Sequence, residues 1–324
     1  MSAIALLGRA LAWLGRQGTR AVAATIFLSL ALPMLSDWLR PAVGPAIFCM
    51  LILAFLRVEP SAFRDQFKGT RLRLLLIALA TTMVVTPLIL GAFYLSIGGG
   101  DLWRELTLAL VMQSAAPPIM SAPAFVALLG LDIALALAAL VSAVTVTPLT
   151  APFFSAFFTG DLLPLDPASL ALRLAFFLGG SFVVARLLRR FVGDRKIRDW
   201  REHIDGLNVI ALFIFAAAIM GIVTYRLIDD PGLVARLLVL SFVITFGLMV
   251  ATAALFWVTG RERALTIGIS AGTRNMGLML AAAGGVSDTV VLYFAVAQFP
   301  IYLAPWLLYR LVQRVLGSQL PPGR

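Results

Sequence analysis

The chain has 324 residues, of which 61% are hydrophobic, and its formal net charge at neutral pH is +10. Soluble domains contain only about 45–50% apolar residues, so a water-soluble fold has no means of burying this much apolar surface. A membrane-spanning helix needs about 20 mostly apolar residues. A chain of this length therefore has room for at most about a dozen such helices and their loops. We expect no separate soluble domain.

The positive charge indicates membrane orientation rather than nucleic-acid binding, because basic loops of membrane proteins collect on the cytoplasmic side. We therefore expect the lipid bilayer as a partner and no nucleic acid. Cys49 is the only cysteine and lies in an apolar run, which excludes a disulfide framework and a thiolate metal site. We expect neither a metal nor a cofactor.

The N-terminal segment, residues 1–20, carries Arg9, Arg16 and Arg20 around a short apolar stretch. It has no small-residue cleavage site ahead of the next apolar run, as a secretory signal peptide would have. The segment is therefore predicted to be an amphipathic helix on the cytoplasmic side.

Ten apolar runs follow, separated by charged residues or by Pro and Gly. Each has the length and composition of a candidate transmembrane helix. The sequence thus predicts an all-α polytopic membrane protein with ten transmembrane helices. In chain order, the candidate spans lie at roughly 21–39, 41–58, 74–97, 105–130, 133–158, 168–188, 206–228, 233–258, 264–286 and 289–311.

Cationic residues are divided unevenly between the alternate loops of this ten-span order. If the N-terminus is cytoplasmic, the outside loops contain only Arg40, Arg104, Arg226 and Arg236, although the chain has 26 Lys and Arg residues. The positive-inside rule then places both termini in the cytoplasm. We expect a multi-pass protein of the cell inner (plasma) membrane.

Span counting indicates two five-helix repeats, which must have opposite orientations because each contains an odd number of spans. A first repeat is expected within 21–188, and a second within 206–311, which also takes the helix at 168–188. A basic cytoplasmic loop, 189–205, and a cytoplasmic tail, 312–324, complete the predicted organisation.

The fourth span contains three prolines, Pro117, Pro118 and Pro123. Each proline removes a backbone donor and clashes with the preceding turn of a helix. In a membrane, a broken helix is tolerated only where it is buried in protein or lines a water-filled cavity. The sequence therefore predicts an interruption here, although prolines that merely kink a packed helix are the alternative.

The ninth span carries Arg274 near its middle. An arginine at that depth costs at least about 2.5–3.5 kcal/mol on insertion scales unless it faces polar groups. Two interrupted helices at equivalent positions of two halves are the best sequence indication of a transporter binding site. The fourth and ninth spans are therefore the predicted functional centre.

These motifs resemble those of the bile acid:sodium symporter family. The resemblance implies two inverted five-helix repeats, broken and crossing helices 4 and 9, and secondary transport by alternating access. The matching residues are Pro117 to Pro123, Leu131 and Asp132 with the Ile-Ala-Leu that follows, Thr147 and Pro148, and Asn275, Gly277 and Leu278.

The chain departs from that family where sodium-coupled members bind their cation. They typically carry a Ser-Asn pair where this chain has Ala122 and Pro123, and a glutamate and a glutamine where it has Ser270 and Arg274. Both changes remove oxygen ligands suited to a hard cation. The comparison implies that the usual sodium sites are lost and that Arg274 substitutes for a bound cation, which leaves the coupling ion unknown: sodium, a proton or none.

An arginine presents a planar fork of donors that matches a carboxylate, so the predicted ligand is a small organic anion. Two other roles for Arg274 remain open, an internal ion pair with Asp132 or Asp288 and a side chain that snorkels at the lipid boundary. The predicted substrate-binding residues are Arg274, Asn275, Thr273, Ser270, Ser121, Gln113, Pro117 and Pro118, with Met112, Met276 and Met279 as possible wall residues.

The sequence as a whole predicts a secondary transporter of a small organic anion and not an enzyme, since no span contains a histidine or a pair of aspartates, and no phosphate loop is present. One alternative is a metalloid exporter of the arsenite type with the same broad fold. Such an exporter is expected to use a cysteine in the fourth span, where this chain has Ala115 and Ala116. The other is a membrane receptor or sensor that binds without transport.

Overall fold

The computed structural model describes residues 3–17, 19–58, 64–160 and 166–317. In these residues the regular structure is helical, and one isolated β-bridge is the only other pairing. Seven of the described helices are long and apolar enough to cross a membrane. The expectation of an all-α protein is confirmed for the described residues, and the long apolar helices support its placement in a membrane. The predicted ten spans in two inverted repeats stay a prediction, since seven of the described helices meet the length and composition of a span.

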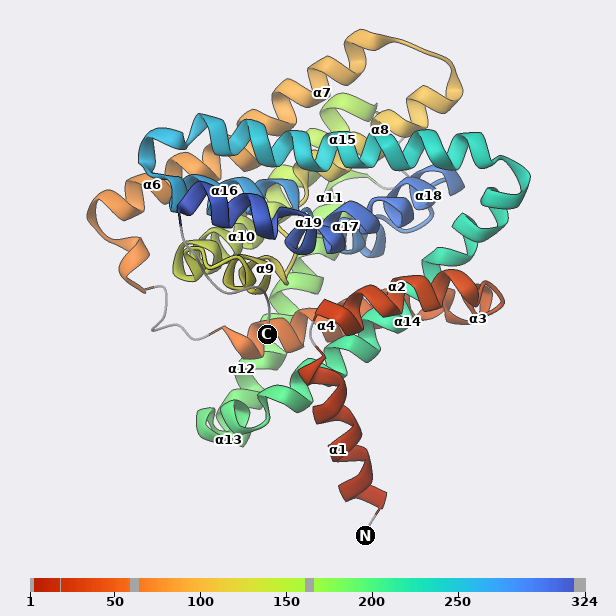
Figure 1. The fold of residues 1–324 in the computed structure, drawn as a ribbon. Helices are drawn as coiled ribbons and strands as arrows, with labels where there is room; N and C mark the ends of the chain where they lie inside the picture. Colours follow the sequence, from red (N-terminus) through yellow and green to blue (C-terminus); the bar gives the residue numbers. More distant parts are fainter. Residues whose placement is uncertain (1–2, 18, 59–63, 161–165, 318–324) are drawn as a thin grey trace.

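The helices form two groups (Figure 1), and in one of them the long helix α14 is the centre. Helices α1, α2, α3 and α4 all pack against α14, and α12 packs against α4. We call these helices the α14 group. Its members are α1 (Ala3–Arg16), α2 (Thr19–Ala31), α3 (Leu35–Leu39), α4 (Val43–Arg57), α12 (Ser181–Val192), α13 (Asp194–Asp199) and α14 (Arg201–Asp229).

The remaining helices, in the upper part of Figure 1, pack around α8, α10 and α16, and we call them the α10 group. They are α6 (Gly69–Ala80), α7 (Thr86–Ile97), α8 (Asp101–Ala115), α9 (Ala122–Leu128), α10 (Ile133–Thr159), α15 (Pro231–Leu255), α16 (Arg261–Gly272), α17 (Met276–Ala283), α18 (Asp288–Val296) and α19 (Gln298–Leu316). Helix α11 (Pro167–Ala175) packs on α10 and α17 and continues into α12 through a π-helical turn, so it links the two groups.

Three helices begin after an aspartate whose side chain accepts a backbone N–H from the third residue beyond it. These N-caps are Asp132 for α10, Asp166 for α11 and Asp230 for α15. An N-cap satisfies one of the amides that a helix start leaves without a partner. Pro167 and Pro231 follow two of the caps at the first helical position, where the missing N–H has no cost.

Two boundaries differ from the sequence-based expectation. The first predicted span, 21–39, is interrupted after Ala31, because Pro33 disfavours the helical conformation of the residue before it, and α3 then leads into α4. The basic segment 189–205, expected to be a loop, is helical almost throughout. A single glycine, Gly193, makes the turn between α12 and α13 with a positive φ of 88°, which only glycine adopts readily.

Helices α15 and α16 pack backbone to backbone because α16 has glycines, Gly268 and Gly272, where it contacts α15. A Cβ atom added at Gly268 would lie 2.6 Å from the carbonyl oxygen of Met249 and 2.9 Å from the Cβ of Ala253. Small residues allow this close approach, which is how helices associate within membranes. The packing fixes α16, and with it the interruption that follows α16.

The substitution Gly268→Ala is expected to lower the thermal unfolding temperature of the protein in detergent. The added methyl group meets a backbone oxygen that has no freedom to rotate away, and such overpacking costs about 1–3 kcal/mol. Gly247→Ala in α15 is the matched control, since a Cβ there meets nothing within 4 Å and alanine is the better helix former. Equal unfolding temperatures for the two variants would contradict the close packing.

Candidate functional site

The two predicted interruptions are present, one between α8 and α9 and the other between α16 and α17. The two interrupted segments cross and pair through their backbones. The N–H of Ile119 donates to the carbonyl of Thr273 over 2.7 Å. The N–H of Asn275 donates to the carbonyl of Pro117 over 2.8 Å. This short antiparallel contact gives partners to groups that a broken helix would otherwise leave unsatisfied.

Local sequence explains both breaks. Ala116 is extended, with ψ at 148°, as expected for a residue that precedes a proline. Asn275 caps the start of α17, because its side-chain oxygen accepts the N–H of Leu278 over 3.1 Å. Helices α8 and α16 therefore end at the crossing, and α9 and α17 begin there. Two partly negative and two partly positive helix ends meet at one place.

Arg274 is fully buried at the crossing, with 0% of its surface exposed. Its guanidinium donates to the carbonyl of Ala116 over 2.8 Å and to the carbonyl of Thr82 over 3.1 Å. The same group lies 3.7 Å from the Sδ of Met83. This burial excludes a side chain that snorkels at the lipid boundary.

The internal ion pair considered from the sequence is not found, because the ion pairs of the described residues do not include Arg274. Asp132 instead caps α10, and Asp288 lies in the first turn of α18. The partners of the guanidinium are carbonyls. The carbonyl of Ala116 lies at the C-terminal end of α8, where a positive charge is favourable. Arg274 thus ties the crossing to α8 and to the π-helical turn between α6 and α7.

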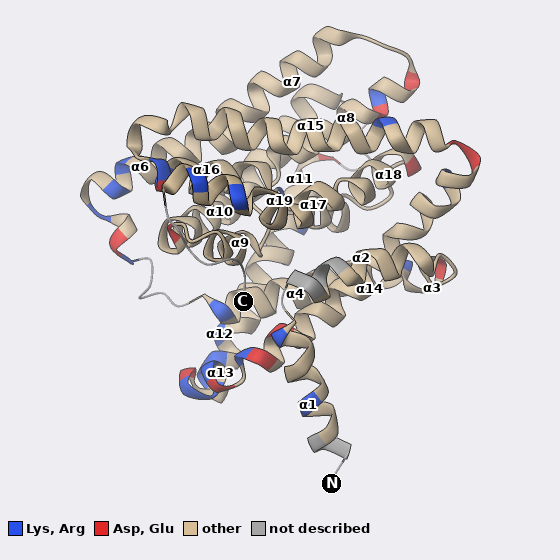
Figure 2. Ribbon diagram, viewed as in Figure 1, with Lys and Arg blue, Asp and Glu red and all other residues tan. Residues whose placement is uncertain are grey.

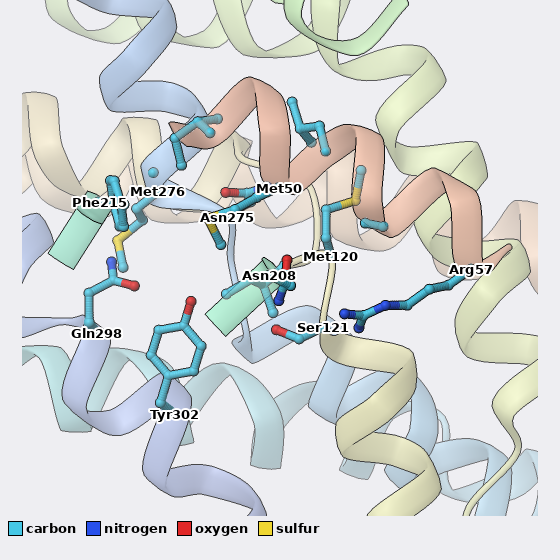
Figure 3. Close-up of a pocket in the computed structure, with 15 residues that line it drawn as sticks. Met50, Arg57, Met120, Ser121, Asn208, Phe215, Asn275, Met276, Gln298 and Tyr302 are labelled. Carbon is cyan, nitrogen blue, oxygen red and sulfur yellow. The ribbon is translucent and has the colours of Figure 1, made fainter. Parts of the chain in front are cut away.

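A cavity lies beside the crossing, between the α14 group and the α10 group (Figure 3). One wall is a stripe along α4 with the spacing of a single helix face. The opposite wall comes from the two interruptions and the start of α19. The lining residues are Ile47, Met50, Leu51, Ala54, Arg57, Ile119, Met120, Ser121, Asn208, Phe215, Asn275, Met276, Gly277, Gln298 and Tyr302.

The cavity is narrow. The volume open to the centre of a water-sized sphere is about 40 Å³, whereas one water needs roughly 10–15 Å³ on this measure. In the conformation described, the site therefore has room for a few waters or a small ligand, and a sterol-sized molecule does not fit.

The polar groups around the cavity are mostly uncharged. Figure 3 shows Ser121, Asn208, Gln298 and Tyr302 turned toward a common space, with the guanidinium of Arg57 at one side. Gln298 donates through its Nε2 to the carbonyl of Phe294 over 2.9 Å, which leaves its side-chain oxygen turned to the cavity. No carboxylate is among the lining residues in the described part of the chain.

Of the predicted site residues, Ser121 and Asn275 line the cavity. Four more belong to the paired segments without lining the cavity, namely Pro117, Pro118, Thr273 and Arg274. The two others are elsewhere: Ser270 donates to the carbonyl of Thr266 within α16, and Gln113 accepts the hydroxyl of Tyr293.

Sequence reasoning missed four polar lining residues, Arg57, Asn208, Gln298 and Tyr302. Arg57 is one of the cationic residues that the positive-inside rule assigns to the cytoplasmic side, and that rule gives it no role in binding. Asn208 and Gln298 are amides within otherwise apolar helices, and polar residues inside spans are a general sign of a functional position. That signal was available in the sequence, but their convergence on one cavity depends on the packing of remote helices.

The fold and this cavity define an all-helical membrane protein with a small polar site between two packed groups of helices. No family model matches the chain, and no curated protein is significantly similar to it. What the site binds therefore has to follow from its own geometry and charge.

The substitution Arg274→Gln is expected to destabilise the protein, because hydrogen bonds from a charged donor contribute about 1.5–3 kcal/mol each and two carbonyls would lose theirs. Thermal unfolding in detergent measures the change. Arg173→Gln is the control, since Arg173 is an exposed arginine of α11 and exposed substitutions change stability by about 0.5 kcal/mol or less. An Arg274→Gln protein as stable as its Arg173→Gln counterpart would contradict the bracing role.

Proposed function

We propose that this protein is a secondary transporter that moves a small organic anion across the plasma membrane by alternating access. The observation that carries the proposal is the position of the cavity. It lies at the crossing of two interrupted helices and is lined from both helix groups. Rocking of one group against the other would change the side to which such a cavity opens.

The proposed topology has ten spans, with both termini in the cytoplasm. The seven long helices supply most of them, while α2, the α8–α9 pair and the α16–α17 pair supply the rest. In this arrangement the interrupted helices are the fourth of each five-helix repeat, in line with the resemblance to the bile acid:sodium symporter family. Figure 2 supports the orientation, since Lys and Arg gather around α1, α12, α13 and the start of α6.

The charge around the cavity favours an anion over a cation. Arg57 is the charged lining residue, and α17 begins at the cavity with its partly positive end. The absence of a lining carboxylate in the described part of the chain removes the group that a cation would need. The small volume favours an anion of a few heavy atoms.

The contacts of Arg274 bear on ion coupling. Its guanidinium donates to the carbonyl of Ala116 at the break after α8. It also donates to the carbonyl of Thr82 and approaches the thioether of Met83, both in the π-helical turn between α6 and α7. Carbonyl oxygens at a broken helix are the ligands that transporters use for a coupling cation. We therefore propose that the tethered guanidinium takes this role and that transport does not require sodium.

The metalloid exporter is less well supported, because no thiol lines the cavity in the described residues and Cys49 is exposed on α4. A receptor that binds without transport is the second candidate, since a cavity of this kind is also able to bind a ligand in place. Flux across a membrane distinguishes the two.

The proposed transport is tested by reconstituting the purified protein into liposomes and measuring counterflow of radiolabelled small carboxylates, in sodium and in potassium buffers. We expect exchange of at least one carboxylate in both buffers. Ala54→Trp should abolish it, because the indole fills the cavity from the α4 wall. Cys49→Trp, an exposed position of the same helix, should retain it.

Binding of a carboxylate without any counterflow would contradict transport and support a receptor. Counterflow that requires sodium would contradict the role proposed for Arg274 while leaving transport intact.

A further inference from the structure

Arg57 stands at the end of the α4 stripe that forms one wall of the cavity. Its Nη2 lies 2.7 Å from Oδ1 of Asp205 on α14, and the two side chains are 30% and 32% exposed. The pair is therefore half-buried at the edge of the site, with the guanidinium turned toward the cavity (Figure 3).

The contact between Arg57 and Asp205 is an ion pair with poor hydrogen-bond geometry. Among the described residues, Nε of Arg57 and Oδ1 of Asp205 are buried atoms without a hydrogen-bond partner. An arginine and a carboxylate can form two parallel hydrogen bonds, and that fork is the strong arrangement. The donors of Arg57 are thus only partly used, although they border the cavity.

The surroundings of the pair leave an excess of positive charge. Arg201 and Glu202 are close enough to act on Asp205. Glu202 is bound to Arg16 over 2.8 Å, so it does not neutralise Arg57. A further negative group beside Arg57 would therefore meet favourable charge.

Asn208 lies three residues after Asp205, on the same face of α14, and it lines the cavity beside Arg57. An anion that replaced Asp205 at the guanidinium of Arg57 would also meet the side-chain amide of Asn208. The two positions offer one charged and one neutral donor to the two oxygens of a carboxylate.

We propose that Arg57 binds the anionic group of the substrate and that Asp205 holds Arg57 only while the cavity is empty. The substrate carboxylate displaces the carboxylate of Asp205 from the guanidinium. This inference rests on the proposed function, and it names the residue that recognises the substrate.

This exchange of partners explains why the carboxylate of Asp205 lies beside the guanidinium of Arg57. An unpaired guanidinium beside a cavity lined largely by apolar side chains would be costly, and Asp205 removes that cost. Its competition also weakens substrate binding, which allows release. A ligand that has to displace an internal group binds with a lower apparent affinity. The apparent affinity is the intrinsic affinity multiplied by the fraction of molecules in which Arg57 is free of Asp205.

Two substitutions with opposite expected effects test the exchange. Thermal shifts of the purified protein are titrated with potassium acetate and potassium pyruvate. Asp205→Asn removes the competitor and is expected to tighten binding by roughly threefold or more. Arg57→Gln removes the guanidinium that binds the anion and is expected to weaken anion binding by roughly tenfold or more. Arg57→Lys keeps the charge and should retain part of the affinity.

The controls are Lys68→Gln and Asp65→Asn, which break an exposed ion pair that does not line the cavity and should leave binding unchanged. A purely structural pair predicts that Asp205→Asn and Arg57→Gln impair the protein alike. The proposal is therefore overturned if both variants bind more weakly, if Arg57→Gln binds as the wild type does, or if neither salt binds the wild type.

Counterflow in liposomes separates this inference from the proposed function. Carboxylate exchange that persists in Arg57→Gln with an unchanged half-saturating concentration leaves transport in place and refutes the role of Arg57. Opposite shifts in binding without counterflow in the wild type would support Arg57 as the anion ligand and refute transport.

Discussion

The structure depends on the crossing of two interrupted helices. A break in a membrane helix frees backbone groups that lipid has no means of satisfying. Here the two breaks satisfy each other through the bonds from Ile119 to Thr273 and from Asn275 to Pro117. The guanidinium of Arg274 donates a hydrogen bond to the carbonyl of Ala116 at the end of α8. With the crossing fixed in this way, α9 and α17 both begin beside one cavity.

Two arginines have different tasks in this arrangement. Arg274 is fully buried and bound to carbonyls of two elements, so its charge belongs to the framework. Arg57 is half-buried, borders the cavity and is held by a single poorly aligned contact with Asp205. A charge held in this way is able to exchange partners, and one that is braced on several sides is not. In the proposed function, Arg274 stabilises the framework and Arg57 recognises the substrate.

The sequence was informative where one residue constrains its own backbone. Pro117 and Pro118 predicted the first break, and Arg274 marked the second. The direction of the Arg274 side chain was not predictable, because depth in a span does not determine which side of the crossing a guanidinium faces. The cavity residues Arg57 and Asn208 were missed, since they come from helices far apart in the chain and only packing brings them together.

The central claim, that one cavity opens to both sides of the membrane, is tested most directly by labelling a single cysteine. Ser121→Cys in a Cys49→Ser background places the only thiol in the cavity wall. An impermeant maleimide is applied to sealed vesicles of each orientation, with and without potassium pyruvate. We expect labelling from both sides, in a ratio that the anion changes. Labelling from one side only, under every condition, would contradict alternating access.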